Sequence, residues 1–477
     1  MNSKIQRIMN RKNIAIAALM LLMPLMMGAQ TLKGSYFLDN SLNRNKLNPA
    51  FAPQSGYWQI PVIGNTSVGL LSNLDLQTFL YPMNGQLYTF LNQNVSLADF
   101  DKSMPNKPHF DVETNVNLLN FGWRASEKSF WTVDLGLRVN ADIDIPRDLF
   151  MFMKKGTGLA ESTYNIGAVH ANVAASVQAA LGYSRDLSDL VNGLRVGGKA
   201  RVILPVAYAG LNLDQVSLSA SPEKWNVQTE GYLHTAMKGL DVMGSDGKFS
   251  PSYSPAGFIS GFGYSFDLGA EYTLEFDGFI NGVSFSAAVT DLGLVHYSSS
   301  AVRGYETTGQ MDWTGLRLSL EEGAMNGVVD ELKNEAMNLT NFTEIKGQGG
   351  LTRSTLPNFY VGAEMPFLNN MMSVGALYSA RKSFNSMRNE LTLSYNLNPV
   401  KWFALGVNYS FLNVAKTMGW ILEFTPKAGP CFYIGSDYMF MEMAKAPETL
   451  GLSTIPTSWR FNLHFGLAVA FGGKEKN

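Results

Sequence analysis

The sequence has few of the residues that metal and redox chemistry require. Only one cysteine, Cys431, occurs among 477 residues, which excludes an intrachain disulfide and a cysteine-cluster metal site. Its five histidines are scattered, and we find no zinc-protease helix, phosphate-binding loop or dinucleotide fingerprint. No serine lies in a nucleophile-elbow motif. We therefore expect no cofactor, no metal and no enzymatic activity.

Charge is also scarce. Charged residues make up 16% of the chain, against roughly 25% in ordinary soluble proteins. At 46% hydrophobic residues and a net charge of −2, the chain does not have the composition of a disordered protein. It also lacks the positive field that binds nucleic acid, so we expect no nucleic-acid partner. Beyond the N-terminus no run of about 18 apolar residues occurs, which argues against a bundle of membrane helices.

The first 29 residues have the pattern of a signal peptide. A basic region precedes an almost wholly apolar stretch at 14–27, and the small residues Gly28 and Ala29 follow. The basic residues are Lys4, Arg7, Arg11 and Lys12. We expect export and cleavage after Ala29, which removes these four charges and leaves a net charge of −6. An uncleaved anchor helix is the alternative, although the apolar stretch is short for a membrane span.

Strict alternation of apolar and polar residues indicates long β-strands. Over 131–145 every odd position is apolar, and every even position is polar or glycine. Successive side chains of a strand point to opposite faces, so one face is apolar and the other polar. At ~3.3 Å per residue such a strand is about 50 Å long, whereas strands in soluble sheets average ~5–6 residues.

The same alternation recurs along the chain, most clearly at 169–183, 194–204, 264–276, 403–411 and 461–471. We expect about 14 antiparallel strands, within a range of 12 to 16, joined in several places by short turns. A closed barrel and a stacked sandwich can both absorb so many amphipathic strands. Strand length, the signal peptide and low charge favour an all-β, closed antiparallel transmembrane barrel in the outer membrane, with lipid against its apolar face. A soluble secreted β-sandwich is the alternative.

Several segments fall outside this alternation. We expect residues 30–56 to form an N-terminal lumen segment, 57–471 the barrel, and 472–477 a polar tail. Insertions are expected at 73–110, 146–168 and 301–357. Within them, 146–156 is predicted to hold a short helix, since Pro146 can begin a helix and Gly156 can end one. Val328, Leu332 and Leu339 lie at helical spacing; this segment is either a cap over the barrel or a surface loop.

The polar faces of the strands supply the candidate lumen residues. These are Asp134, Arg138, Asp142, His170, Arg195, Lys199, Arg201, Asp267, Glu271, Glu275 and His464. The sign of the charge alternates from strand to strand. This predicts a cross-strand salt-bridge network that braces the lumen, and a charge-selective pore is the alternative. The two histidines are expected to act as hydrogen-bonding lumen residues.

The segment around Asn48-Pro49-Ala50, ahead of the first expected strand, carries a resemblance. A similar element in a similar place occurs in FadL-like outer-membrane barrels and in the PorV-like barrels of Bacteroidota. Residues 146–156 and 221–225 resemble pieces of a Bacteroidota barrel family of unknown function. The resemblance implies a barrel of roughly 14 strands with its N-terminal segment folded into the lumen, and it makes Asn48, Pro49 and Ala50 a candidate plug motif.

Two functional hypotheses follow. FadL-like barrels pass hydrophobic small molecules, so the resemblance implies a channel or transporter for small hydrophobic or polar solutes. PorV-like barrels instead serve as partners of secretion machinery, which would make the chain a scaffold for secreted or envelope proteins. In either case the chain lies in the outer membrane and contacts its lipid.

Overall fold

The computed structural model describes residues 32–472, except 84–85, 156–161, 221–224, 244–248, 255, 308–309, 314–341, 413–414, 440–442, 446–453 and 457–459. The expected signal peptide and the helical spacing at 328–339 lie outside the described residues. No helix in these residues is long and apolar enough to cross a membrane.

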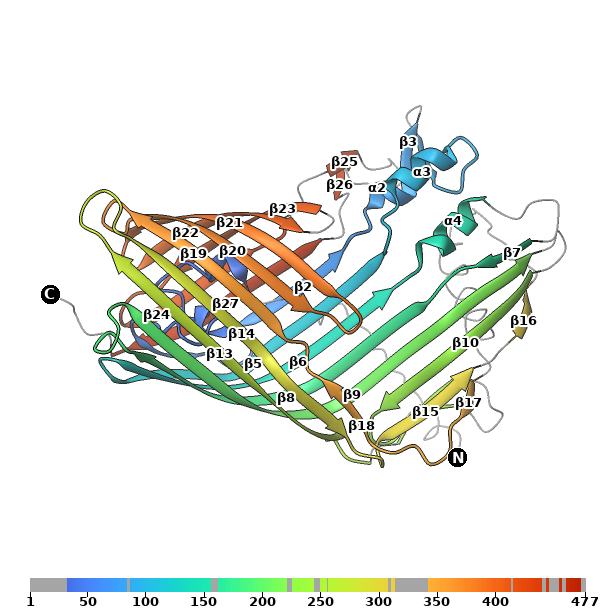
Figure 1. Ribbon diagram of the computed structural model, residues 1–477, viewed down its shortest axis with the longest axis horizontal. Coiled ribbons are helices and arrows are strands. Elements are labelled where there is room, and N and C mark those ends of the chain that lie inside the picture. Colours follow the sequence, from blue (N-terminus) through green and yellow to red (C-terminus); the bar gives the residue numbers. More distant parts are fainter. Residues whose placement is uncertain are drawn as a thin grey trace, which may run out of the picture.

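The long strands form a closed antiparallel barrel with 14 strand positions (Figure 1). Its first position is shared by β1 (Gly56–Gln59) and β2 (Thr66–Ser72), and each of them pairs with both β5 and β27, which closes the ring. The other positions, in ring order, are β5 (His109–Ser126), β6 (Ser129–Asp144), β8 (Val169–Asp186), β9 (Leu194–Ala220), β13 (Gly261–Glu275), β14 (Gly282–Tyr297), β18 (Leu351–Ser354) with β19 (Asn358–Phe367), β20 (Met372–Lys382), β21 (Met387–Val400), β22 (Phe403–Leu412), β23 (Ala415–Phe424), β24 (Gly429–Ser436) and β27 (Phe461–Phe471). The predicted barrel is confirmed, and the sandwich alternative is wrong.

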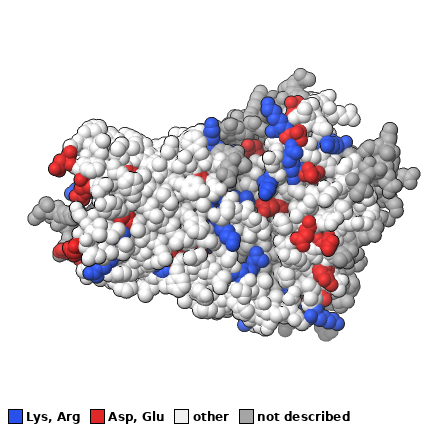
Figure 2. Space-filling model, viewed as in Figure 1, with Lys and Arg blue, Asp and Glu red and all other residues white. Residues whose placement is uncertain are grey.

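The barrel is polar inside and apolar outside, the reverse of a soluble protein. On β13, Ser265 and Asp267 are 0% and 2% exposed, whereas their neighbours Phe266 and Leu268 are 50% and 57% exposed. Figure 2 shows a broad face of the wall with almost no charged residues, between charged residues at its two ends. Since the alternation continues around the ring, the apolar side chains form a continuous outer surface.

The two ends of the barrel differ (Figure 1). At one end, short turns join neighbouring strands, such as that between β5 and β6. The opposite end carries the long insertions. Their elements are α2 (Leu76–Phe79), β3 (Leu80–Met83), β4 (Gln86–Thr89), α3 (Leu97–Ser103), α4 (Arg147–Lys155), β7 (Ser162–Asn165), β10 (Trp225–Ala236), β11 (Leu240–Met243), β12 (Phe249–Tyr253), β15 (Val302–Thr307), β16 (Gln310–Trp313), β17 (Phe342–Glu344), β25 (Met443–Lys445) and β26 (Thr454–Pro456).

The insertions make the wall taller on one side. β9 pairs with β13 along its first half and with β10 along its second half, so β10 continues the position of β13. β15 and β16 extend the sheet in turn by pairing with β10. The insertion 301–357 thus contributes strands in its described part. Elsewhere at this end, α2, α3 and α4 pack through a cluster that includes Phe79, Phe100 and Phe150; α4 lies where the sequence predicted a short helix.

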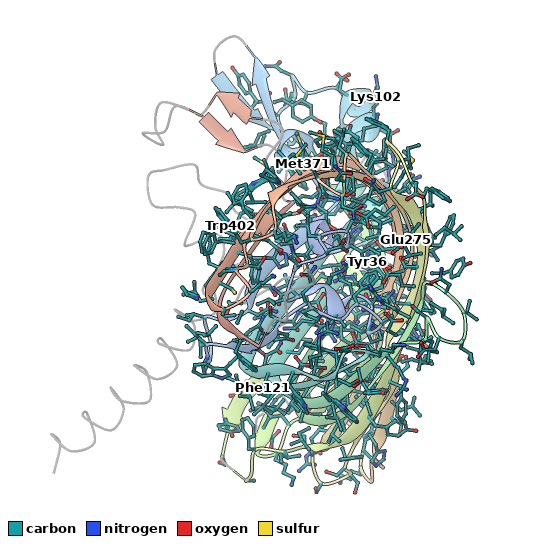
Figure 3. The ribbon with its side chains drawn as sticks, turned by 90° about the vertical axis from the view of Figure 1, so that its left-hand side faces the viewer. Tyr36, Lys102, Phe121, Glu275, Met371 and Trp402 are labelled. Atoms are coloured by element: carbon teal, nitrogen blue, oxygen red, sulfur yellow. The ribbon has the colours of Figure 1, made fainter. Side chains whose placement is uncertain are left out.

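Residues 32–55 run through the inside of the barrel, where Figure 3 places Tyr36. Two single 3-10 turns, η2 (Lys33–Ser35) and η3 (Arg44–Lys46), are the only helical pieces described within them. The ring of Tyr36 packs edge-on against those of Phe37 and Phe51, 4.9 and 5.0 Å away between centroids. This cluster is one of several small apolar clusters formed by this segment inside the barrel, and Leu42 and Leu38 belong to two others.

Candidate functional site

The Asn-Pro-Ala motif rests on wall positions that have no side chain. The Asn48 amide donates to the carbonyl of Ala270 at 3.1 Å and accepts from the backbone N–H of Ala50 at 3.0 Å. A Cβ atom added to Gly197 would lie 2.1 Å from the carbonyl oxygen of Pro49, and one added to Gly269 would lie 2.0 Å from Oδ1 of Asn48. The motif therefore needs glycines on the wall for its close approach.

The start of the segment is fixed to the opposite side of the ring. The backbone N–H groups of Lys33 and Gly34 donate to the Asp437 carboxylate at 2.7 and 2.8 Å. The Lys33 ammonium pairs with Glu390 on β21 and donates to the hydroxyl of Tyr438 at 2.8 Å. Residues 32–55 are thus attached to distant wall positions, as a plug is.

Arg44 anchors the middle of the segment. It pairs with Asp39 within the segment and lies 3.7 Å from the Glu271 carboxylate on β13. Its guanidinium also stacks over the ring of Phe51, 4.0 Å from the centroid, a contact that is favourable when desolvated.

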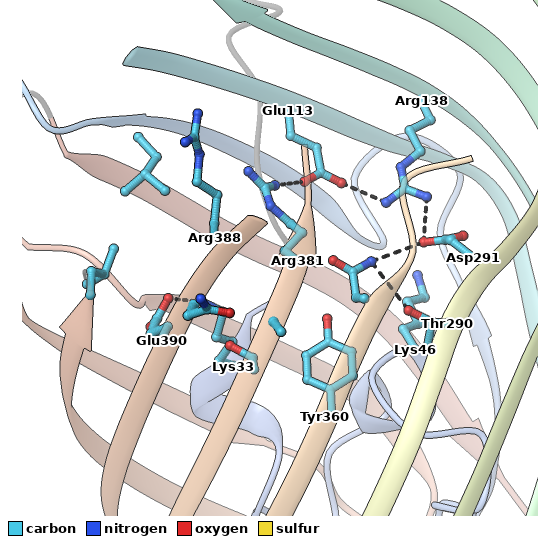
Figure 4. Close-up of a pocket in the computed structure, with 16 residues that line it drawn as sticks. Lys33, Lys46, Glu113, Arg138, Thr290, Asp291, Tyr360, Arg381, Arg388 and Glu390 are labelled. Carbon is cyan, nitrogen blue, oxygen red and sulfur yellow. Dashed lines mark hydrogen bonds and ion pairs between the residues drawn. The ribbon is translucent and has the colours of Figure 1, made fainter. Parts of the chain in front are cut away.

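A charged network crosses the lumen (Figure 4). The guanidinium of Arg138 on β6 lies 2.8 Å from Glu113 on β5 and 2.8 Å from Asp291 on β14. Arg381 on β20 contacts the other oxygen of Glu113 from across the barrel, at 2.5 Å. Cations and carboxylates alternate, so each charge compensates its neighbours away from bulk solvent.

A second group of charges joins this network on the β9 side. Arg201 pairs with Asp267 at 2.9 Å and also with Asp291, and Lys199 pairs with Asp134 on β6 at 2.9 Å. Asp291 has a φ of 60°, where β14 carries a bulge opposite Asp267. The backbone N–H of Asp291 donates to Asp267 at 2.7 Å, which holds this uncommon conformation.

The turn between β20 and β21 folds inward at the insertion end. Ser383 donates to Asp111 and to Asp142, both at 3.0 Å, and Arg388 lies 2.8 Å from Asp111. The ring of Phe384 packs 6.3 Å from that of Tyr208 on β9. This turn therefore contacts both sides of the lumen above the charged network.

The wall bulges between β1 and β2 but stays hydrogen-bonded on both sides, since Ile60 and Ile63 bond to Leu467 of β27 and Val62 donates to Asn117 of β5. Seven positions separate Gln59 from Thr66, whereas their partners on β27, Ala468 and Phe465, are three positions apart. The extra residues protrude, and the side chains of Val62 and Ile63 are exposed. Behind them Asn43 of the N-terminal segment accepts hydrogen bonds from Gln59 and Asn65, at 2.9 and 2.8 Å.

Several internal cavities adjoin the network. One of about 130 Å³ lies beside the bulge between β1 and β2 and is lined by residues that include Asn65, Arg138, Lys199 and His464. A second, of about 50 Å³, is lined by Arg138, Arg381 and Glu390 (Figure 4). Lys46, Arg138 and Asp291 line both, so the cavities share one wall.

The remaining predicted site residues lie apart from this centre. His170 contacts Asn212 at 3.0 Å, and Arg195, which is half exposed, lies 3.3 Å from Glu271. Glu275 is exposed at the end of β13. His464 is buried beside the larger cavity, and its Nε2 has no hydrogen-bond partner in the described part of the chain.

Sequence reasoning missed several members of the site. Glu113, Asp291 and Arg381 were not among the predicted lumen residues, although each belongs to the cross-lumen network. Glu113 alternates with apolar Val112, so its position on a strand was a usable signal. Lys46 was missed because the N-terminal segment has no periodicity. Among the described residues no group of histidine, cysteine and carboxylate side chains could hold a metal ion.

The model of a family of unknown function (DUF5723) matches residues 49–437. No curated protein matches the chain. Among solved structures, the Ralstonia pickettii toluene transporter TbuX is similar at 8% identity, over 94% of this chain and 97% of that chain, with a TM-score of 0.39. The Pseudomonas putida toluene transporter TodX is similar at 10% identity, over 93% and 95%, with a TM-score of 0.31. The translocator domain of the autotransporter NalP from Neisseria meningitidis follows at 8% identity, over 87% and 88%, with a TM-score of 0.32.

Proposed function

The chain belongs to a family of unknown function, DUF5723, and we propose that it is an outer-membrane channel whose lumen is closed by its own N-terminal segment and opens to small polar solutes. The observation that carries this proposal is the pair of polar cavities within the barrel. Both are lined in part by residues 32–55.

The exterior supports a membrane location. Phenylalanine and leucine side chains on β13 are half exposed beside buried polar neighbours, and water would penalise such a surface heavily. Aromatic side chains also gather near the short turns: the rings of Trp123 and Trp131 stack at 6.3 Å, and that of Trp402 lies 5.2 Å from Phe424. An aromatic girdle at the lipid–water interface is expected of outer-membrane barrels.

The unequal ends give an orientation. Outer-membrane barrels have short periplasmic turns and longer extracellular loops. The turns of this barrel, such as that joining β5 to β6, therefore face the periplasm, and the insertions with α2, α3 and α4 face outward. The β20–β21 turn then closes the outer approach to the lumen.

The lining of the cavities distinguishes between the two solute classes. Charged and amide side chains predominate around both of them, and a hydrophobic molecule there would leave these groups desolvated without a partner. A polar solute can instead form hydrogen bonds with these groups in place of water. A further cavity beside Tyr208 and Phe384 is lined mainly by apolar surface. The charged network and the N-terminal segment occupy the lumen of the barrel, so they must move before a solute can pass. Under this proposal, the structure corresponds to a closed channel.

Vesicle swelling with the purified full-length protein tests this proposal. Vesicles that contain the protein are diluted into isotonic solutions of small sugars and amino acids of increasing size. We expect slow swelling with the smallest solutes and none with large sugars. Absence of swelling with every solute, in vesicles where the barrel is shown to be inserted, would refute the channel.

No described feature favours the scaffold hypothesis, since the insertion at 301–357 is largely outside the described residues.

A further inference from the structure

One ammonium group in the lumen makes no ion pair within the described part of the chain, although Asp134 is near enough to attract it electrostatically. Lys46 is the last residue of η3, and its Nζ makes no ion pair or hydrogen bond within the described part of the chain. The nearby Lys199 differs, because its ammonium is held by Asp134 at 2.9 Å. An unpaired ammonium away from bulk water is costly unless a partner compensates it.

The lining of the cavity beside Lys46 holds more cations than carboxylates, although Glu113 and Asp267 outside the lining pair with Arg138 and Arg201. Four cations line it, Lys46, Arg138, Lys199 and Arg201, against the two carboxylates of Asp134 and Asp291. Both carboxylates are already engaged by cations other than Lys46. Burial lowers the pKa of the Lys46 ammonium to about 8, as expected for a cation with too few compensating charges.

Two residues that line this cavity, Arg138 and His464, each carry a buried nitrogen without a hydrogen-bond partner in the described part of the chain, and neither nitrogen is exposed at the cavity surface. Nε of Arg138 is buried with no hydrogen bond, although both terminal nitrogens of its guanidinium are paired. Nε2 of His464 is also without a partner, and the residue is only 2% exposed. An ammonium and a guanidinium Nε can only donate, and an imidazole can donate in one of its tautomers. A group in the cavity that pairs with the Lys46 ammonium must therefore be an acceptor.

The cavity has room for such a group. Its volume of about 130 Å³ far exceeds the ≳10–15 Å³ that one water needs on the same kind of measure. We propose that this cavity is a binding site for the oxyanion group, carboxylate or phosphate, of a small solute, with Lys46 as its counter-ion. This rests on the proposed channel function and gives its solute class.

Titration calorimetry on the full-length protein in detergent tests the site. The probes are succinate, inorganic phosphate and, as a neutral control, succinamide. We expect succinate or phosphate to bind and succinamide not to bind, and the stronger of the two anions identifies the oxyanion. If neither anion binds, or if succinamide binds equally well, the proposal is wrong.

The variant Lys46→Met removes the ammonium and keeps most of the side-chain length. We expect its affinity for the preferred anion to fall at least ~10-fold, equivalent to about 1.4 kcal/mol, while the anion-free protein keeps or gains thermal stability because an uncompensated charge has been removed. Lys102→Met on the exposed helix α3 is the matched control and should bind as the unchanged protein does. Full affinity in Lys46→Met would overturn the assignment.

The site and the channel can fail separately. Anion binding without solute flux keeps the site and removes the channel function. Flux of neutral solutes without anion binding keeps the channel function and removes the anion site.

Discussion

The guanidinium of Arg138 on β6 and the carboxylate of Asp291 on β14 lie 2.8 Å apart, although β8, β9 and β13 stand between their strands in the barrel wall. The contact therefore crosses the lumen instead of running along the sheet. Asp291 reaches it from a bulge with a left-handed backbone, so a local irregularity in one strand serves a contact across the barrel.

Loss of this contact should destabilise the barrel. Arg138→Met leaves Glu113 with Arg381 and Asp291 with Arg201 as their remaining cations, and we expect the free energy of unfolding to fall by about 2–4 kcal/mol. Urea unfolding in detergent measures it. Arg195→Met is the control, because that side chain is 48% exposed and its pair should contribute less than about 1 kcal/mol. Equal losses in both variants would contradict a special role for the cross-lumen pair.

Neighbouring glycines on β9 offer a matched test of how the N-terminal segment docks. In Gly197→Ala the new methyl group would lie 2.1 Å from the Pro49 carbonyl, whereas in Gly198→Ala its nearest atoms are 3.6 Å away. We expect trypsin to cleave at Arg44 or Lys46 much faster in Gly197→Ala, because the displaced segment leaves the lumen. Gly198→Ala should resist trypsin as the unchanged protein does; similar rates in both variants would show that the motif does not depend on this approach.

The outer face should not tolerate charge at mid-height. Leu268→Arg places a cation on the lipid-facing side of β13, at an expected cost of about 2–4 kcal/mol at the bilayer midplane. Leu190→Arg lies in the turn between β8 and β9, where the side chain is 81% exposed, and should be nearly neutral. Folding yield into lipid vesicles measures the difference. If Leu268→Arg folds as well as Leu190→Arg, this surface does not face lipid.

Lys46 should give stability a particular dependence on pH. Its pKa is lowered to about 8 in the folded protein by burial, against ~10.4 in an unfolded chain. Between these values the unfolded chain binds more protons, so the contribution of Lys46 to stability rises with pH and is least favourable below pH 8. Relative to Lys46→Met, the unchanged protein should therefore be less stable near pH 7 and approach it near pH 10. A stability difference that stays constant over this range would contradict the lowered pKa.

The sequence predicts the faces of the strands but not the contacts across the lumen. Period-two alternation places Asp267 inside and Phe266 outside because strand geometry alone decides this. The pairing of Arg138 with Asp291 depends on closure of the ring and on a bulge, and no local pattern encodes either. Lys46 lies on an irregular segment, where position is decided by docking against glycines far along the chain. The candidate site was therefore predictable where it lies on regular strands and not elsewhere.

The most direct test of the channel is solute flux with the Gly197→Ala and Gly198→Ala pair. Both proteins are inserted into vesicles at equal density, and swelling is followed with a small amino acid and with a large sugar. We predict that Gly197→Ala admits the amino acid faster than Gly198→Ala, whose rate should equal that of the unchanged protein. Equal rates for the two variants, in preparations where trypsin shows that the segment has been released in Gly197→Ala, would contradict the claim that the N-terminal segment closes a conducting lumen.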